Sequence, residues 1–350
     1  MTKKIIYIIA SRSWGGGEEY IYRIGNALRE RGYEMAFVLQ KKSNAALKER
    51  FSGIGEVKEI GVSNNLSKLS PLISAWRLYR FAKKQGATVI HVNAKLDYFV
   101  AVWAKIFSHK RLRIVATNHL VKRAKRSLYR LWIYSHIDAL INVSECAKKE
   151  FFKIEGVRER FKNVYVIKNS VPDLPCEREE KEKRESKIKV LYHGRIHPEK
   201  GILDLIKHWD KVNATLYIAG TGNKIPETEN VVNLGFCQNV REILRKFDIS
   251  VAPSIVKESG GPLSVIEAMA SGLPVVASDN GCQKEYVRDG VDGILCQAGN
   301  WDAFVTAINR LAEDAELRLR MGENSRHHYE NELSFDKFIN GIEMVYEKCQ

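Results

Sequence analysis

Short apolar runs alternate with amphipathic stretches through the first half of the chain. The runs predict buried strands, and apolar side chains that recur at helical spacing between them predict helices. Strands that alternate with helices form a parallel sheet covered on both faces. The predicted strands are 3–10, 35–39, 88–92, 113–117, 139–143 and 164–167, and the predicted helices are 18–31, 72–85 and 94–107.

The same pattern restarts after a stretch that is rich in charge and poor in apolar residues, which we interpret as a linker. The second half predicts strands at 188–193, 214–219, 231–234, 249–252, 274–277 and 293–295, with helices at 201–209, 240–246, 302–312 and 335–347 and one that starts at Pro262. We therefore expect an α/β protein with two Rossmann-like, doubly wound domains. The expected boundaries are 1–172, a linker at 173–187, 188–330, and a C-terminal helix at 331–350 that packs back toward the N-terminal domain.

The helix that starts at Pro262 carries the most informative motif. Pro262 suits the first helical position, and Gly260 and Gly261 let a ligand approach the backbone closely. The amides of Gly261, Leu263 and Ser264 then form an anion site at the start of the helix. Glu258 on one side of this site and Glu267 one turn into the helix would hold hydroxyls, as a nucleotide sugar requires. The alternative is an ordinary Gly-Pro helix start with two solvated glutamates.

Two basic residues follow the first strand of the second half. Arg195 lies where open α/β sheets bind ligands, and Lys200 opens the next helix. Together they would neutralise the charge of a departing diphosphate, although a solvated loop pair is the alternative. The first half also has a glycine loop, Gly15–Gly17, after its first strand. It lacks the G-x-G-x-x-G spacing and an acidic ribose anchor, which argues against nicotinamide chemistry.

In this order the motifs resemble the retaining GT-B glycosyltransferases, the family of group 1 and family four enzymes. The resemblance extends over nearly the whole chain and is strongest from Tyr192 to Gly293, with further matches at Asn169-Ser-Val171 and from Glu285. It implies that Arg195 and Lys200 hold the donor diphosphate, Glu267 the ribose hydroxyls and Glu258 the transferred sugar. It also implies that Gly16 and Gly17 face the diphosphate or acceptor, and that His119 lies near the donor sugar.

The chain departs from the family pattern at one place. The family has seven residues between its two glutamates, whereas eight separate Glu258 from Glu267, so strict register would put Ser259 at the sugar. We favour Glu258, because the glycines after it absorb an inserted residue. The family's proposed route lets the leaving diphosphate accept the acceptor's proton on the same face. No Asp-x-Asp is present, so we expect no metal and no cofactor beyond a nucleotide-sugar substrate, with a UDP-sugar the commonest in the family.

The net charge is +14 and the isoelectric point is near 9.4. Nine basic and no acidic residues fall between Lys105 and Arg130, interleaved with apolar groups and followed by Trp132. We expect segment 105–132 to bind an anionic membrane surface. A solvated basic surface is the alternative, and nucleic acid is not expected because no binding module is recognisable. Scattered cysteines and the lack of a signal peptide or membrane span predict a cytoplasmic protein, peripheral at the inner face of the cell membrane.

Three functions remain open at this point. The first is sugar transfer to a glycan or lipid-linked glycan, such as a precursor of lipopolysaccharide or another surface polysaccharide. The second is a GT-B relative that epimerises a free sugar nucleotide. The third is nucleic-acid binding, which the charge alone suggests and which leaves the arrangement of Arg195, Lys200, Glu258 and Glu267 unexplained.

Overall fold

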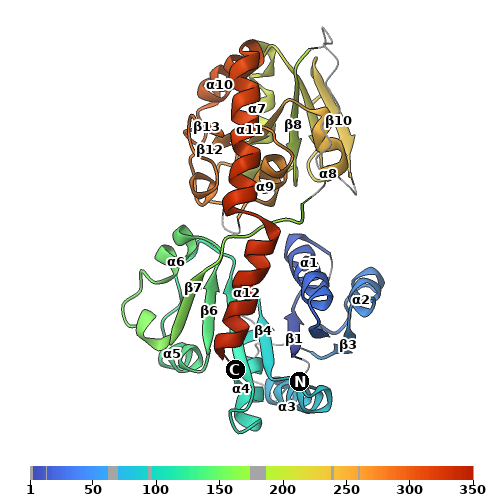
Figure 1. The fold of residues 1–350 in the computed structure, drawn as a ribbon, viewed down its shortest axis with the longest axis vertical. Coiled ribbons are helices and arrows are strands. Elements are labelled where there is room, and N and C mark those ends of the chain that lie inside the picture. The colour runs from blue at the N-terminus through green and yellow to red at the C-terminus, as the bar shows by residue number, and fades with distance from the viewer. Residues whose placement is uncertain are drawn as a thin grey trace. The chain divides into compact units, whose positions relative to one another are not determined.

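The computed structural model divides the chain into two compact units, which are described separately (Figure 1). Unit 1 comprises Met1–Val143, Ala147–Ile167 and Phe338–Gln350, and unit 2 comprises Ser144–Cys146 and Lys168–Lys337. The structure describes residues 3–12, 14–61, 70–93, 97–173, 187–237, 240–258 and 261–349. Nearly all of the expected linker, together with Ser259 and Gly260, lies outside these residues.

Unit 1 is built on a parallel sheet of seven strands in the order β3-β2-β1-β4-β5-β6-β7. The strands are β1 (Lys4–Ile9), β2 (Glu34–Leu39), β3 (Glu56–Glu59), β4 (Val89–Val92), β5 (Arg113–Asn118), β6 (Ala139–Asn142) and β7 (Asn163–Val166). The apolar pattern predicts all of them except β3. That strand lies at the sheet edge and alternates charged residues with a single valine, so it has no apolar run to detect.

Helices cover both faces of this sheet. The helices of unit 1 are α1 (Gly16–Glu30), α2 (Ala45–Ser52), α3 (Ser70–Gln85), α4 (Asp97–Phe107), α5 (Leu128–Ser135) and α6 (Glu145–Phe151), together with most of α12 (Phe335–Cys349). Alternate strand residues such as Ile6 and Val38 share one core with α3, α4 and α5. On the opposite face, Tyr346 of α12 shares hydrogen bonds with Tyr7 of β1 and His91 of β4, both 2.5 Å long. The C-terminal helix is therefore anchored to the sheet of unit 1 (Figure 1).

Unit 2 repeats the plan with a parallel sheet of six strands in the order β10-β9-β8-β11-β12-β13. The strands are β8 (Lys189–His193), β9 (Thr215–Ala219), β10 (Val231–Gly235), β11 (Ile249–Ala252), β12 (Val275–Ser278) and β13 (Gly293–Cys296). The helices are α7 (Ile202–Ile206), α8 (Val240–Ile243), α9 (Leu263–Ala270), α10 (Trp301–Glu313) and α11 (Ala315–Glu332). The predicted α/β class and two doubly wound sheets are confirmed.

Several helices differ from the sequence prediction. The predicted helix 201–209 is the short α7 followed by a 3-10 turn, and α2, α5, α6 and α11 were not predicted. Helix α11 is long but polar, and its buried positions include Gly322, Ser325 and His328, so it lacks the apolar stripe that marks an amphipathic helix. Within the described ranges no helix is long and apolar enough to cross a membrane.

Candidate functional site

Unit 2 has a topological switch point between β8 and β11. From β8 the chain continues to β9 and β10 on one side, and from β11 it continues to β12 and β13 on the other. Open α/β sheets bind their ligands outside the carboxyl ends of the two strands at such a point. The loops that begin there, Gly194–Gly201 after β8 and Pro253–Pro262 after β11, carry the residues singled out from the sequence.

The loop after β8 presents Arg195 to solvent on a braced backbone. The Tyr192 hydroxyl donates to the Arg195 carbonyl at 2.6 Å, and burial raises the pKa of that hydroxyl well above its ordinary value. The Ile196 amide donates to the carbonyl of Thr221 in the loop after β9 at 2.8 Å. At Gly222 a Cβ would lie 2.1 Å from the Ile196 carbonyl oxygen, so only glycine lets the two loops approach this closely. Arg195 is therefore exposed on a fixed backbone.

Lys200 ends a 3-10 turn, Pro198–Lys200, and does not open an α-helix as the sequence predicted. Gly201 follows it with a left-handed backbone (φ 71°) and caps α7. The turn is joined to the loop after β11, because the Ile255 amide donates to the Glu199 carbonyl at 3.0 Å. A Cβ at Gly201 would lie 2.0 Å from the Pro253 carbonyl oxygen. The turn therefore fixes Lys200 against the loop after β11.

The two loops meet in an ion pair. Lys200 Nζ donates to Glu258 Oε1 at 2.5 Å, and the Ser254 hydroxyl donates to the same carboxylate. The side chains of Lys200 and Glu258 are 26% and 17% exposed, so the pair is partly shielded from solvent. The Glu258 carbonyl also accepts a hydrogen bond from the Cys282 amide at 3.2 Å. The fold of unit 2 thus holds together two residues that are predicted to contact different parts of one ligand.

Helix α9 begins at Leu263, and Pro262 is its N-cap residue, so the expected first helical position of Pro262 is wrong by one residue. The first intrahelical bond runs from the Ile266 amide to the Pro262 carbonyl at 3.1 Å. The amides of Leu263 and Ser264 come before it, as the orphan donors of a helix start do. Gly261 has a left-handed backbone and packs against the hydroxyl of Tyr286. Gly260 lies outside the described residues.

Glu267 is buried in α9 and faces the end of β8. Its Oε2 lies 3.3 Å from Nε2 of His193, the last residue of β8. His193 is 7% exposed, and neither ring nitrogen makes a hydrogen bond to a described residue. Buried polar groups normally have partners. His193 was not predicted from the sequence, and the signal that could have found it is its position at the carboxyl end of a strand, directly before Gly194.

The predicted residues of unit 1 also gather at the carboxyl edge of its sheet. His119 follows β5, and its Nε2 lies 3.0 Å from Oδ1 of Asn93, which follows β4. The ring of Tyr20 in α1 meets the His119 ring edge-on, with centroids 4.8 Å apart. Gly16 and Gly17 form the first turn of α1 and are not in a loop as predicted; a Cβ at either would meet open space. The edge therefore brings His119 near the helix that Gly16 and Gly17 begin.

Two family models together match the chain almost continuously. "Glycosyl transferases group 1" matches residues 175–328, and "Glycosyltransferase Family 4" matches residues 14–173. The first model spans the switch-point loops of unit 2 and the second spans the glycine turn and His119 of unit 1. The chain belongs to the group 1 glycosyltransferases.

Individual relatives of this glycosyltransferase agree over its length. An uncharacterized glycosyltransferase from Haemophilus influenzae is 27% identical over 93% of this chain and 95% of its own. The N-acetyl-alpha-D-glucosaminyl L-malate synthase of Bacillus anthracis is 24% identical over 95% of this chain and 94% of its own.

Solved structures match the fold. HepE from Anabaena, in complex with UDP, superposes with a TM-score of 0.81 at 20% identity over 99% of this chain and all of its own. The lipopolysaccharide outer core galactosyltransferase WaaB, in its apo form, superposes with a TM-score of 0.75 at 18% identity over 99% of each chain. The glycosyltransferase therefore has the GT-B fold.

His119 of the glycosyltransferase is held neutral, because burial lowers its pKa to about 4. The pKa of this imidazole in the unfolded chain is about 6.5. As the pH falls from about 6.5 toward 4, the unfolded state therefore binds a proton at His119 while the folded state does not. The resulting stability is complete above pH 6.5 and is lost toward pH 4. In His119→Gln, we expect the loss of stability between pH 7.5 and pH 5 to be smaller than in wild type by up to about 2 kcal/mol. Thermal denaturation at several pH values measures it, and parallel wild-type and variant curves would contradict the assignment.

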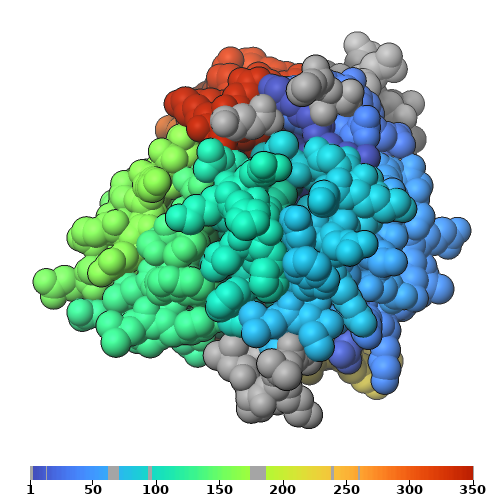
Figure 2. Space-filling view, turned by 90° about the horizontal axis from the view of Figure 1, so that it is seen from below, coloured from blue at the N-terminus to red at the C-terminus, as the bar shows by residue number. Residues whose placement is uncertain are grey.

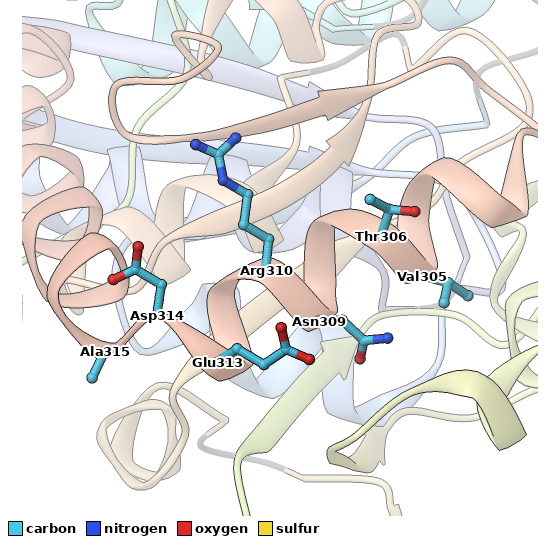
Figure 3. A pocket seen from close by; sticks show the side chains of 7 residues that line it. All are labelled: Val305, Thr306, Asn309, Arg310, Glu313, Asp314 and Ala315. Carbon is cyan, nitrogen blue, oxygen red and sulfur yellow. The ribbon is translucent and has the colours of Figure 1, made fainter.

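A shallow pocket elsewhere in unit 2 has no part in this site (Figure 3). It lies on the outer side of α10 and at the start of α11, and none of its lining residues belongs to the switch-point loops. Its Asn309 side chain already accepts from the Asn213 amide at 2.9 Å and donates to the Lys211 carbonyl at 2.8 Å. Within the described part of the chain, no group of three or more His, Cys, Asp or Glu side chains is placed to hold a metal ion.

Proposed function

We propose that the protein is a retaining, metal-independent glycosyltransferase that uses a UDP-sugar and a glycan or lipid-linked glycan acceptor. The observation that carries the proposal is the Lys200–Glu258 ion pair beside Arg195 and the start of α9, at the switch point of unit 2. Cations there suit a diphosphate, and a carboxylate suits sugar hydroxyls. The UDP bound to HepE supports the choice of base.

In this proposal unit 2 binds the donor. Arg195, Lys200 and the first amides of α9 stabilise the negative charge that develops on the diphosphate. Glu267 binds the ribose hydroxyls, and the buried His193, whose Nε2 lies 3.3 Å from Glu267 Oε2, orients that carboxylate. Glu258 contacts the transferred sugar. Ser259, which strict family register would put at the sugar, lies outside the described residues.

The transfer itself needs no protein nucleophile. The bond from the anomeric carbon to the diphosphate oxygen breaks, and the acceptor oxygen bonds to that carbon on the same face. The acceptor's proton passes to the leaving diphosphate, so charge and atoms balance. His119 with its pKa of about 4 is neutral at pH 7 and serves as a hydrogen-bonding group, as do the backbone groups of Gly16 and Gly17. The alpha linkage in the name of the Bacillus anthracis relative supports retention.

The acceptor is proposed to belong to lipopolysaccharide or another surface polysaccharide, with the protein in the cytoplasm at the inner face of the cell membrane. The name of WaaB, a lipopolysaccharide galactosyltransferase of the same fold, supports this class.

A panel of sugar nucleotides, followed by product analysis, tests the proposal. We expect UDP and one UDP-sugar to raise the melting temperature, since a bound donor stabilises the fold. Nuclear magnetic resonance of the transfer product should show the donor's anomeric configuration. An inverted product would contradict retention. Interconversion of the free sugar nucleotide without an acceptor would identify an epimerase, and salt-sensitive nucleic-acid binding with no response to any sugar nucleotide would identify the third alternative.

A further inference from the structure

The charge of the chain is concentrated in one part of unit 1. Residues 70–137 contain 14 Lys and Arg and a single acidic residue, Asp97, so they account for +13 of the net charge of +14. Asp97 is fully buried. The rest of the chain is close to neutral, so the long-range field of the protein comes from α3, α4, α5 and the segments between them.

Part of the segment 105–132, predicted to be a basic surface, has a structural role. Lys105 is 6% exposed, and its Nζ donates to Asp138 Oδ2 at 2.6 Å and to the His136 carbonyl at 2.9 Å. Arg113 lies 3.6 Å from the same carboxylate, and Arg123 lies 3.3 Å from Glu150. Lys105 is therefore removed from the predicted surface. The exposed basic residues of this face include Arg77, Arg80, Lys110, Arg111, Lys125 and Arg126.

Aromatic side chains from three helices form one continuous cluster on this face. The aromatic patch consists of Trp76 of α3, Phe99, Trp103 and Phe107 of α4, and Tyr129 and Trp132 of α5. Successive rings lie 5.5 to 6.3 Å apart between centroids. Trp76, Tyr129 and Trp132 keep 47%, 39% and 36% of their surface exposed. Figure 2 shows the surfaces of α3 and α4 side by side, with the residues that follow α4 next to them.

Aliphatic side chains extend the exposed area beyond the rings. Leu128 is 89% exposed and stands between Arg126 and Arg130, and Ile73 is 50% exposed one turn before Trp76. Contiguous exposed apolar surface of this kind marks an interaction site. Half-exposed Trp and Tyr suit the boundary between lipid headgroups and acyl chains, and basic residues beside them suit anionic headgroups.

We propose that this face of unit 1 docks on an anionic lipid bilayer, with the aromatic patch and Leu128 at the headgroup level and Lys125, Arg126 and Arg80 over the lipid phosphates. A second copy of the chain is disfavoured as the partner, because two such basic faces repel. Nucleic acid is disfavoured because most of the rings pack tilted or edge-on against one another and share the surface with aliphatic groups, which offer bases no stacking platform. The proposal rests on the proposed function for its purpose, which is to reach a lipid-linked acceptor.

Flotation of the full chain with vesicles tests the docking. We expect binding to phosphatidylcholine vesicles that contain phosphatidylglycerol, little binding to pure phosphatidylcholine, and weaker binding when salt is raised from roughly 0.05 M to 0.5 M. Lys125→Gln with Arg126→Gln should weaken partitioning about 25-fold, at about fivefold for each charge removed. Trp76→Ser with Trp132→Ser should also weaken it, even at low salt. The matched control is Lys224→Gln with Arg320→Gln, two exposed residues of unit 2, which should bind as wild type does.

The melting temperature with and without UDP is measured for every variant. Folded patch variants should keep the wild-type response to UDP, so a failure of docking is distinguished from a failure of the proposed function. The proposal is overturned if wild type does not float with anionic vesicles, or if the patch variants float as the control does. It is also overturned if the face binds single-stranded nucleic acid in preference to vesicles.

Discussion

Lys200→Ala is expected to lower kcat/KM for sugar transfer about 100- to 1,000-fold, the range found when one charge-stabilising donor is removed from an active site. The loss has two physical causes. The diphosphate loses a cation that partly neutralises it. In addition, the Glu258 carboxylate, which Lys200 Nζ contacts at 2.5 Å, is left without its charged partner at the place where the phosphates bind. Initial rates over a range of donor concentrations measure the effect.

The chain offers a matched control for this substitution. Lys207 makes an equally short ion pair with Asp204, 2.6 Å long, but its side chain is 67% exposed and lies outside the switch-point loops. Lys207→Ala should change kcat/KM by less than about twofold, as expected for an exposed pair. If both lysine variants were equally active, Lys200 would have no role in the chemistry.

Glu258→Gln separates the two partners of the pair. If Glu258 contacts the transferred sugar, the rate of sugar transfer falls in the variant. The variant nevertheless binds UDP at least as tightly as wild type, because Lys200 no longer has to break an ion pair before it contacts the diphosphate. If Glu258 only positions Lys200, affinity for UDP and transfer fall together. The double variant Lys200→Ala with Glu258→Gln completes the cycle and should be less impaired in UDP binding than Lys200→Ala alone.

Gly201→Ala is expected to destabilise unit 2 by about 3 kcal/mol or more, which corresponds to a fall in melting temperature of roughly 6 to 12 °C. A left-handed backbone alone costs alanine about 1 to 2 kcal/mol. The rest comes from contact, because the new Cβ would lie 2.0 Å from the Pro253 carbonyl oxygen and 2.9 Å from the Trp301 ring. Pro253 directly follows β11, so its carbonyl group cannot move without shifting the loop after that strand, and the two loops must separate.

Gly299→Ala isolates the contact from the backbone strain. Gly299 also has a left-handed backbone (φ 81°), but a Cβ there meets nothing within 4 Å. We expect about 1 kcal/mol of destabilisation and an unchanged response to UDP. Gly201→Ala should in contrast lose that response, because Lys200 moves with the turn. Equal melting temperatures for the two variants would show that the close approach of the loops does not stabilise the fold.

The sheets were predictable because most strands are buried apolar runs, which are typical of a parallel sheet covered by helices on both faces. The failures have a shared cause. Strand β3 and helix α11 are held by tertiary contacts of charged, small or polar residues, so neither shows a periodic apolar pattern. The sequence also misplaced Lys105 on the surface, because its partly buried partner Asp138 lies more than thirty residues away along the chain.

The candidate site was predictable as a set of residues and not as a set of contacts. Arg195, Lys200, Glu258 and Glu267 follow from motif order, but the pairing of Lys200 with Glu258 depends on two loops that meet only when β8 and β11 are neighbours. His193 was missed because a histidine at the end of an apolar run is an ordinary core residue until Glu267 is placed 3.3 Å from it. The aromatic patch was missed in part because Trp76 and Phe99 lie outside the basic segment, and only folding brings α3 to α4 and α5.

The most direct test of the central claim is isothermal titration of UDP into the wild-type protein and into the double variant Arg195→Ala with Lys200→Ala. The account predicts saturable binding of one UDP to wild type. It predicts at least about 100-fold weaker binding to the variant, since two charge-assisted contacts of about 1.5 to 3 kcal/mol each are lost. If wild type does not bind UDP, or if the folded variant binds it as tightly as wild type does, the switch point of unit 2 is not the nucleotide site.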